Sequence, residues 1–189
     1  MSLPPLLTGP RLALRALCPA DADGPYPGWL NDGQVCAGNS HGVWPYGREQ
    51  ARDFIARAAT ARDALTLAIT LRSDGRHVGN VGLQGIHPIY RSAEFAILLG
   101  DRAAWGQGYG LEAARLIVAH GFAALNLHRI HCGTFADNAG MLALAARLGM
   151  REEGRRVEAA YKNGRFVDVI EFGLLRDQFV ASAAATGNS

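Results

Sequence analysis

The chain has 189 residues, of which 49% are hydrophobic, and this is the size and apolar content of one domain with a substantial core. Its 19 basic and 17 acidic residues give a formal charge of +2 without any long run of like charges, so we expect no nucleic-acid partner. No apolar stretch reaches the roughly 20 residues that cross a membrane, and no secretory pattern opens the chain, so we expect a soluble, cytoplasmic protein without a membrane partner.

The first half of the chain predicts strands that alternate with helices. Residues 12–16 alternate apolar and polar side chains with a period of two, which is typical of a strand. Residues 19–47 are rich in Gly, Pro, Asn and Asp and predict loops and short helices. Residues 48–60 carry an apolar stripe at helical spacing. Strict alternation over residues 65–71, followed by an Asp-Gly turn and an extended segment to residue 86, predicts a hairpin.

The second half continues with a strand over residues 93–99, in which Glu94 faces away from Phe95 and Leu99. The elements after it are a helix with a core stripe of Leu111, Ala114, Val118, Phe122 and Leu125, a strand over residues 129–135, a helix closed by Gly149, and two strands around residues 150–160 and 167–175. Asp137 or Asn138 can cap the second helix, and Asn163-Gly164 predicts a hairpin turn. Together these elements predict an α+β fold with a mixed, mostly antiparallel sheet and about four helices.

Residues 105–110, Trp-Gly-Gln-Gly-Tyr-Gly, are the most informative stretch, because they place three glycines at alternate positions between a strand and a helix. Missing side chains let backbone N–H groups approach an anion, and the helix N-terminus adds unpaired donors and a partial positive charge. The stretch therefore predicts a site for a phosphate or pyrophosphate group.

Other interpretations of this glycine stretch are less well supported. The third glycine is at position 110 and not 111, and no βαβ unit with an acidic residue about 20 positions further on is evident, which disfavours a nicotinamide dinucleotide site. No lysine and hydroxyl pair follows the glycines, which disfavours the phosphate loop of nucleotide hydrolases. A merely flexible strand-to-helix turn remains the alternative.

Cysteines and histidines indicate neither disulfides nor metal. Cys18, Cys36 and Cys132 are odd in number and widely spaced, which argues against a disulfide framework. His128 and His131 would point to opposite faces of a strand, so one metal ion could not easily bind both.

Four pieces of the chain occur together in a characteristic order: Ala93-Glu94-Phe95, the loop at residues 105–110, Leu-Asn-Leu-His-Arg-Ile at 125–130, and Asp137-Asn138 followed by Arg-Leu-Gly-Met at 147–150. They resemble the acyl-CoA-binding half of the GNAT N-acetyltransferases, and most closely the ribosomal-protein (RimJ/RimL-like) branch. Weaker likeness at residues 11–15 and 164–175 extends the resemblance over nearly the whole chain. It implies a GNAT fold, with a mixed, mostly antiparallel sheet of six to seven strands and about four helices, in one domain over residues 1–179. We expect residues 180–189 to be a frayed tail.

The resemblance implies acetyl-CoA as a co-substrate and no metal. Backbone groups of Ile97, Leu98 and Leu99 would pair with pantetheine as an added strand would. The pyrophosphate would rest on the glycine loop: Gly106, Gln107, Gly108, Tyr109, Gly110 and Leu111. Arg147 would meet the adenosine end, and its alternative is a solvated helix residue. Asn138 would orient a water or touch pantetheine, and a simple helix cap is its alternative.

Glu94 matches the glutamate that serves as general base in many GNAT enzymes, although an outward carboxylate on a half-exposed strand is the alternative. The two acids that usually protonate the departing thiolate are absent, because Ala145 replaces a tyrosine and Met141 replaces a serine. Cys132, Tyr161 or bulk water could take that role, and the sequence does not choose among them.

The amine acceptor should be selected by residues 24–47 and 161–165, since loops on a fixed scaffold usually carry specificity. Trp29, Trp44 and Tyr46 could wall its pocket, and plain packing is their alternative. The resemblance thus implies an acetyl-CoA-dependent N-acetyltransferase that acts directly on a protein N-terminal, small-molecule or amino-sugar amine, as a monomer or homodimer. The alternative is a degenerate acyl-CoA-binding protein that acts as a sensor or assembly partner.

Overall fold

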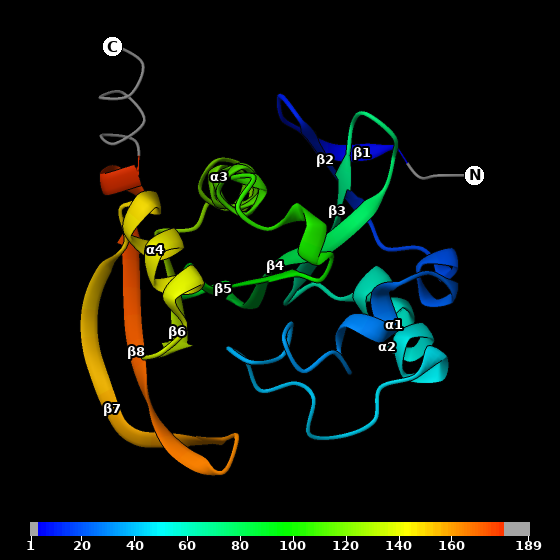
Figure 1. The fold of residues 1–189 in the computed structure, drawn as a ribbon. Helices are drawn as coiled ribbons and strands as arrows, with labels where there is room; N and C mark the ends of the chain where they lie inside the picture. Colours follow the sequence, from blue (N-terminus) through cyan, green and yellow to red (C-terminus); the bar gives the residue numbers. More distant parts are fainter. Residues whose placement is uncertain (1–3, 180–189) are drawn as a thin grey trace.

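The structure is a computed structural model that describes residues 4–179. Within this range the strands form one mixed sheet in the order β1-β2-β3-β4-β5-β6-β8-β7, with helices on both faces (Figure 1). The strands are β1 (Pro5–Thr8), β2 (Leu12–Ala16), β3 (Leu65–Leu71), β4 (His77–His87), β5 (Ser92–Leu99), β6 (Arg129–Phe135), β7 (Arg151–Lys162) and β8 (Arg165–Leu175). The α-helices are α1 (Tyr26–Trp29), α2 (Arg48–Thr60), α3 (Tyr109–Ala123) and α4 (Ala139–Leu148), and short 3-10 helices span η1 (Pro19–Asp23) and η2 (Arg102–Ala104).

The α+β class and the mostly antiparallel sheet agree with the prediction, but the sheet has eight strands over residues 4–179, one or two more than expected. The strand that the sequence analysis did not predict is β1, which pairs with β2 alone at the edge of the sheet. It begins with Pro5, and a proline is tolerated at the first position of an edge strand because its missing N–H is not needed there. The expected frayed tail, residues 180–189, lies outside the described residues.

Two hydrophobic clusters cover the two faces of the sheet. The larger cluster packs α3 and α4 against the sheet through Leu83, Phe95, Ile117 and Leu148, among others. The smaller cluster packs η1, α1 and α2 against the opposite face. The expected core stripe of α3 is buried except for Leu125, which is 37% exposed. The helix ends at Ala123, and Leu127 takes the core position that we expected for Leu125.

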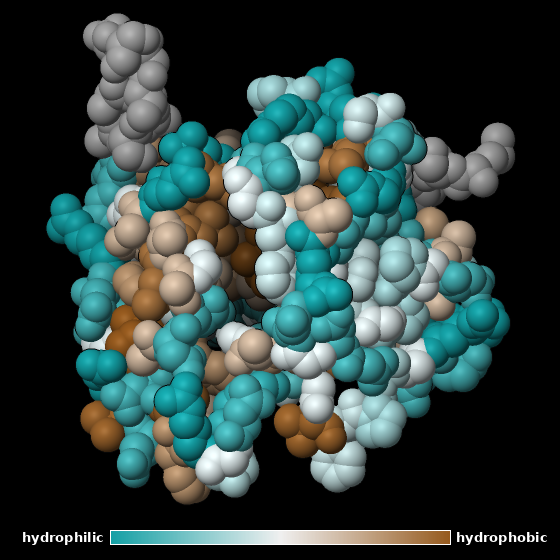
Figure 2. All heavy atoms as spheres, in the orientation of Figure 1, coloured by the Kyte–Doolittle hydropathy of each residue, from teal (hydrophilic) through white to brown (hydrophobic). Residues whose placement is uncertain are grey.

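Strands β5 and β6 are parallel, and they pair only over Ser92–Glu94 and Arg129–His131. Beyond Glu94 the two strands separate, while β5 stays paired with β4 up to Leu99. The edge of residues 95–99 that faces β6 therefore has no strand partner among the described residues. This divergence opens the sheet near its middle, and Figure 2 shows the molecule hollowed on this face, with hydrophobic side chains gathered along one wall.

No helix within residues 4–179 is both long enough and apolar enough to cross a membrane.

Candidate active site

A cavity of about 1240 Å³ occupies the space where β5 and β6 diverge. Four segments supply most of its wall: residues 94–99 of β5, residues 104–111 of the glycine loop and α3, residues 137–144 around the start of α4, and residues 37–41, which we call the strap. The cavity thus brings together three of the four parts of the chain that carried the resemblance, and the fourth, residues 125–130, does not line it.

The β5 wall includes Ile97, Leu98 and Leu99, the residues expected to pair with pantetheine. Their free backbone edge can receive an extended ligand as an additional strand. The carbonyl oxygen of Leu99 already accepts a hydrogen bond of 2.8 Å from the indole Nε1 of Trp105. This contact holds the beginning of the glycine loop against the end of β5.

The glycine loop has the backbone geometry that its sequence predicts. Gly106 and Gly108 have φ angles of 73° and 78°, a left-handed conformation that glycine adopts without the strain of a side chain. Gly108 is the N-cap of α3 and supplies no side-chain acceptor, so the first amides of the helix remain available to an anion. Five of the six residues at 106–111 line the cavity, and Gln107 is the exception.

A contact that sequence reasoning missed braces this loop. Glu112, in the first turn of α3, accepts hydrogen bonds from the backbone N–H groups of Arg11 and Leu12 and from the Nε of Arg11. Arg11 belongs to a segment of weaker resemblance, and an acidic residue in a first helical turn is a common signal. Neither signal predicts that Arg11 contacts Glu112, because the two residues lie 101 positions apart in the sequence.

Glu94 lines the cavity from β5, at the point where β5 and β6 separate. Its side chain is exposed, and on either side its backbone neighbours are Gln84 of β4 and His131 of β6. No hydrogen bond or ion pair to this carboxylate is formed by any residue in the range 4–179. A carboxylate without a partner at the wall of a cavity is free to accept a proton.

Asn138 uses both ends of its side-chain amide. Its Oδ1 accepts a hydrogen bond from the backbone N of Met141 and caps α4, as one of the two interpretations expected. Its Nδ2 donates to the carbonyl oxygen of Gly38 at 2.9 Å and so ties the strap to α4. A contact between Asn138 and pantetheine stays a prediction.

Arg147 lines the cavity from the last turn of α4. Within the described part of the chain its guanidinium has no ion-pair partner, so it is available to an anionic group. Its contact with the adenosine end of a ligand also stays a prediction.

Two of the three candidates for a proton donor to a thiolate are poorly placed. Cys132 is fully buried, and burial, aided by the charges of Glu94 and Glu171, raises the pKa of its thiol to about 12. Its Sγ lies 3.7 Å from the Sδ of Met150, within the core. Tyr161 is 63% exposed, packs edge-on against Phe166, and is not part of the cavity wall.

The aromatic wall of the cavity differs from the expected one. Tyr46 lines the cavity, together with Tyr26 and Phe54, which sequence reasoning did not select. Trp29 is instead buried in the smaller core cluster, and Trp44 is 83% exposed and does not line the cavity. For these two tryptophans the structure supports packing and exposure, respectively.

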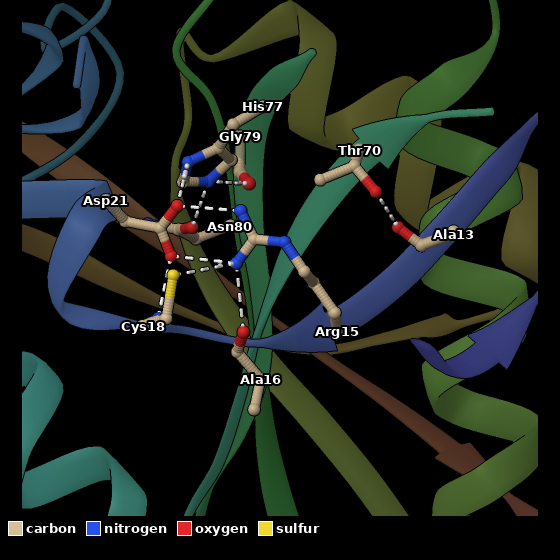
Figure 3. Close-up of polar contacts among 9 residues, drawn as sticks. All are labelled: Ala13, Arg15, Ala16, Cys18, Asp21, Thr70, His77, Gly79 and Asn80. Carbon is tan, nitrogen blue, oxygen red and sulfur yellow. Dashed lines mark hydrogen bonds and ion pairs between the residues drawn. The ribbon is translucent and has the colours of Figure 1, made fainter. Parts of the chain in front are cut away.

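A buried polar network ends at this wall (Figure 3). The carboxylate of Asp21 accepts hydrogen bonds of 2.8 and 2.7 Å from the guanidinium of Arg15 and lies 3.4 Å from the Nδ1 of His77. The Nε2 of His77 lies 2.9 Å from the Oδ1 of Asn80, which lines the cavity. Burial alone would raise the pKa of Asp21, but hydrogen bonds from Arg15 and from the backbone of Cys18, together with the nearby imidazole of His77, hold it well below its usual range.

A parallel strand pair that opens beside a glycine loop and a helix N-terminus defines the fold class that the sequence resemblance predicted. The chain matches the family model described as the acetyltransferase (GNAT) domain over residues 11–151, and it belongs to this family.

Individual relatives agree with this assignment. The chain is 28% identical to the spermidine N(1)-acetyltransferase of Escherichia coli (strain K12) over 116 residues, which make up 61% of this chain; the match spans 62% of the length of that relative. It is 25% identical to the uncharacterized N-acetyltransferase YoaA of Bacillus subtilis (strain 168), over 91% of this chain and 97% of that protein. The spermidine N-acetyltransferase of Vibrio cholerae, solved with CoA and spermine, has the same fold, with a TM-score of 0.82, 24% identity, and coverage of 91% of this chain and 99% of that one. The structure of RimL, a ribosomal L7/L12 α-N-protein acetyltransferase in complex with CoA, gives a TM-score of 0.81 at 20% identity, over 90% of this chain and 97% of that one.

Proposed function

We propose that the protein is an N-acetyltransferase that moves the acetyl group of acetyl-CoA directly to a primary amine, with Glu94 as the general base. One observation carries the proposal. The free edge of β5, the uncapped start of α3 and the unpartnered carboxylate of Glu94 all line one cavity.

The residues of the cavity fit an acyl-CoA. The free backbone edge at Ile97, Leu98 and Leu99 would hold the amide-bearing arm, and the glycine loop would hold the pyrophosphate. Arg147 would meet the adenosine end. Relatives with this fold, named as acetyltransferases and solved with CoA, support the same assignment.

The chemistry then depends on position and on one proton. An enzyme that holds the amine and the thioester together makes their reaction effectively intramolecular, which can lower the activation free energy by on the order of 7 kcal/mol or more. Glu94 would accept the amine proton, directly or through water, and such proton transfer raises the reaction rate by a further factor of about 10²–10⁴.

No general acid is needed for the departing sulfur. A thiol with a pKa near 8.5 leaves as a thiolate at neutral pH without great cost. With Ala145 and Met141 at the usual positions of the acid, we propose that solvent protonates the thiolate.

We also propose that the protein belongs to the RimJ/RimL-like branch, that it is cytoplasmic and binds no metal, and that it is a monomer or homodimer. Relatives named for spermidine and for a ribosomal protein both share the fold, so the branch depends on which acceptor the cavity selects.

Thiol release from acetyl-CoA in the presence of an amine panel tests the proposal, with calorimetry of CoA binding beside it. The panel contains peptides, polyamines, aminoglycosides and amino sugars. We expect CoA to bind and at least one amine to release thiol. CoA binding without release for any amine would favour the degenerate binding protein, and absence of CoA binding would overturn both.

A further inference from the structure

We infer that the acceptor is a monoamine whose remainder is neutral or anionic, and that polyamines such as spermidine are poor acceptors. This inference rests on the proposed function and deepens it. It depends on the charges beside Glu94 and in the loops at residues 24–47 and 161–165, which we call the acceptor side of the cavity.

Few carboxylates are available there. Within the described chain, the carboxylates that line the cavity are Glu94 and Asp137. Asp137 forms an ion pair with Arg165. Glu94 is therefore the one lining carboxylate without a cationic partner among residues 4–179, and it is sufficient for a single ammonium group, the one that reacts.

The loops expected to select the acceptor add no further negative charge. Residues 24–47 contain one carboxylate, Asp32. It does not line the cavity, and its oxygens accept hydrogen bonds from the backbone N of Gln34 at 2.8 Å and of Val35 at 3.2 Å, while Arg102 lies 3.7 Å away. Residues 161–165 contain no carboxylate at all.

The same loops do carry positive charge. Lys162 is the only lysine of the chain, and it lies at the end of β7, beside the strap. Its Nζ donates a hydrogen bond of 2.5 Å to the carbonyl oxygen of His41, which lines the cavity. No carboxylate within residues 4–179 lies within ion-pair distance of this ammonium, so its charge is not compensated locally.

The side chain of His41 responds to this charge. Burial lowers the pKa of the imidazole below its usual value, and the positive charge of Lys162 lowers it further. Arg156 also lines the cavity, but its guanidinium is 2.7 Å from a carboxylate oxygen of Glu171 and is therefore neutralised. Lys162 does not itself line the cavity, but it contacts His41 from behind and adds an uncompensated positive charge to this side.

A polyamine would fit this environment badly. Once one ammonium group has paired with Glu94, each additional ammonium group would lose its hydration without finding a carboxylate to pair with. A desolvated, unpaired charge is costly in free energy. It would also be repelled by Lys162. A neutral remainder avoids both costs, and an anionic remainder is attracted by the same lysine. The chain thus departs from its relatives that are named for spermidine.

Three acceptors that carry a primary amine at one end of a three-carbon chain test the inference: propane-1,3-diamine, 3-aminopropan-1-ol and β-alanine. Spermidine is measured beside them, and kcat/KM is expressed per unit of unprotonated amine. We expect the neutral and anionic compounds to exceed both cationic ones by about tenfold, a difference that shrinks at high salt as surface charges are screened. Equal or higher kcat/KM for propane-1,3-diamine or spermidine overturns the inference.

The variant Lys162→Glu separates charge from the support of the strap. Loss of support would change kcat/KM for all acceptors by one factor, whereas a charge effect changes their order. We expect the ratio of propane-1,3-diamine to β-alanine to rise about fivefold or more. Lys162→Gln, which can still donate to His41, should give an intermediate ratio. Arg57→Glu, on the exposed side of α2, makes the same change in net charge and should leave the ratio unaltered.

An unchanged ratio in Lys162→Glu contradicts the inference. Failure of the proposed function looks different, because then no amine, whatever its charge, would release thiol from acetyl-CoA. Rapid acetylation of polyamines would overturn the inference alone and leave the acetyltransferase activity intact.

Discussion

The guanidinium Nη1 of Arg11 donates a hydrogen bond of 2.8 Å to the carbonyl oxygen of Gln107 and so joins the start of β2 to the glycine loop. The same guanidinium pairs with Glu112 at 2.8 Å and lies 4.7 Å from the ring centroid of Tyr109. Arg11 therefore contacts the loop, the first residue of α3 and its first turn at once. A cation in this position also favours an anion bound at the loop.

Arg11→Ala should weaken CoA binding, because the loop loses its brace and the site loses a nearby positive charge. Since Arg11 is half exposed, its contacts are worth about 1 kcal/mol, which corresponds to a roughly fivefold rise in Kd. Calorimetry with CoA measures this, with Arg57→Ala as the control. A Kd equal to that of the parent protein would show that the loop keeps its shape without Arg11.

Glu94→Gln should lower kcat about 10²-fold or more, because the amide cannot accept the amine proton. The Kd for acetyl-CoA should stay within about twofold, since the residues proposed to hold CoA do not include Glu94 and the substitution keeps the size of the side chain. Steady-state kinetics and calorimetry measure the two quantities. If kcat does not change, Glu94 is an ordinary exposed strand residue.

Asp21→Asn should destabilise the protein by about 3 kcal/mol at pH 7, because the charge of Arg15 would lose its buried partner. The pKa of Asp21 is lowered in the folded protein, so its contribution to stability is complete above the unfolded pKa of about 3.9 and is lost as the pH falls below that value. Urea unfolding at several pH values should therefore show the difference between parent and variant shrinking below about pH 4.

Asp23→Asn is the matched control for Asp21→Asn. Asp23 pairs with Arg48 and Arg52, but these side chains are half exposed, so we expect a loss below about 1 kcal/mol. Equal losses for the two variants would contradict the special role of the buried network.

Cys132 should resist alkylation by iodoacetamide at pH 8 in the native protein. Its thiol is buried, and with a pKa raised to about 12 it stays protonated, whereas the thiolate is the reactive form. Mass spectrometry should find the label on Cys132 only after unfolding in urea. Cys132→Ala should leave kcat within about twofold, and a larger loss would restore this thiol as a candidate proton donor.

Much of the fold could be predicted from local patterns. The helix expected over residues 48–60 is α2 (Arg48–Thr60), and the hairpin turn at Asn163-Gly164 has positive φ at both residues. Such elements follow from the periodicity of apolar side chains and from the freedom of glycine, which act within a few residues. β1 could not be predicted in this way, because a four-residue segment that begins with a proline carries little periodicity and becomes a strand only by pairing with β2.

The sequence by itself determined the conformation of the glycine loop, because Gly106 and Gly108 adopt φ angles that depend on their own backbone. The tertiary structure alone decided which groups surround it. Phe54 and not Trp29 lines the cavity, Asn138 ties α4 to Gly38, and Lys162 reaches His41. These contacts join residues about a hundred positions apart, and no local pattern encodes them, since they arise only when helices and loops pack on the sheet.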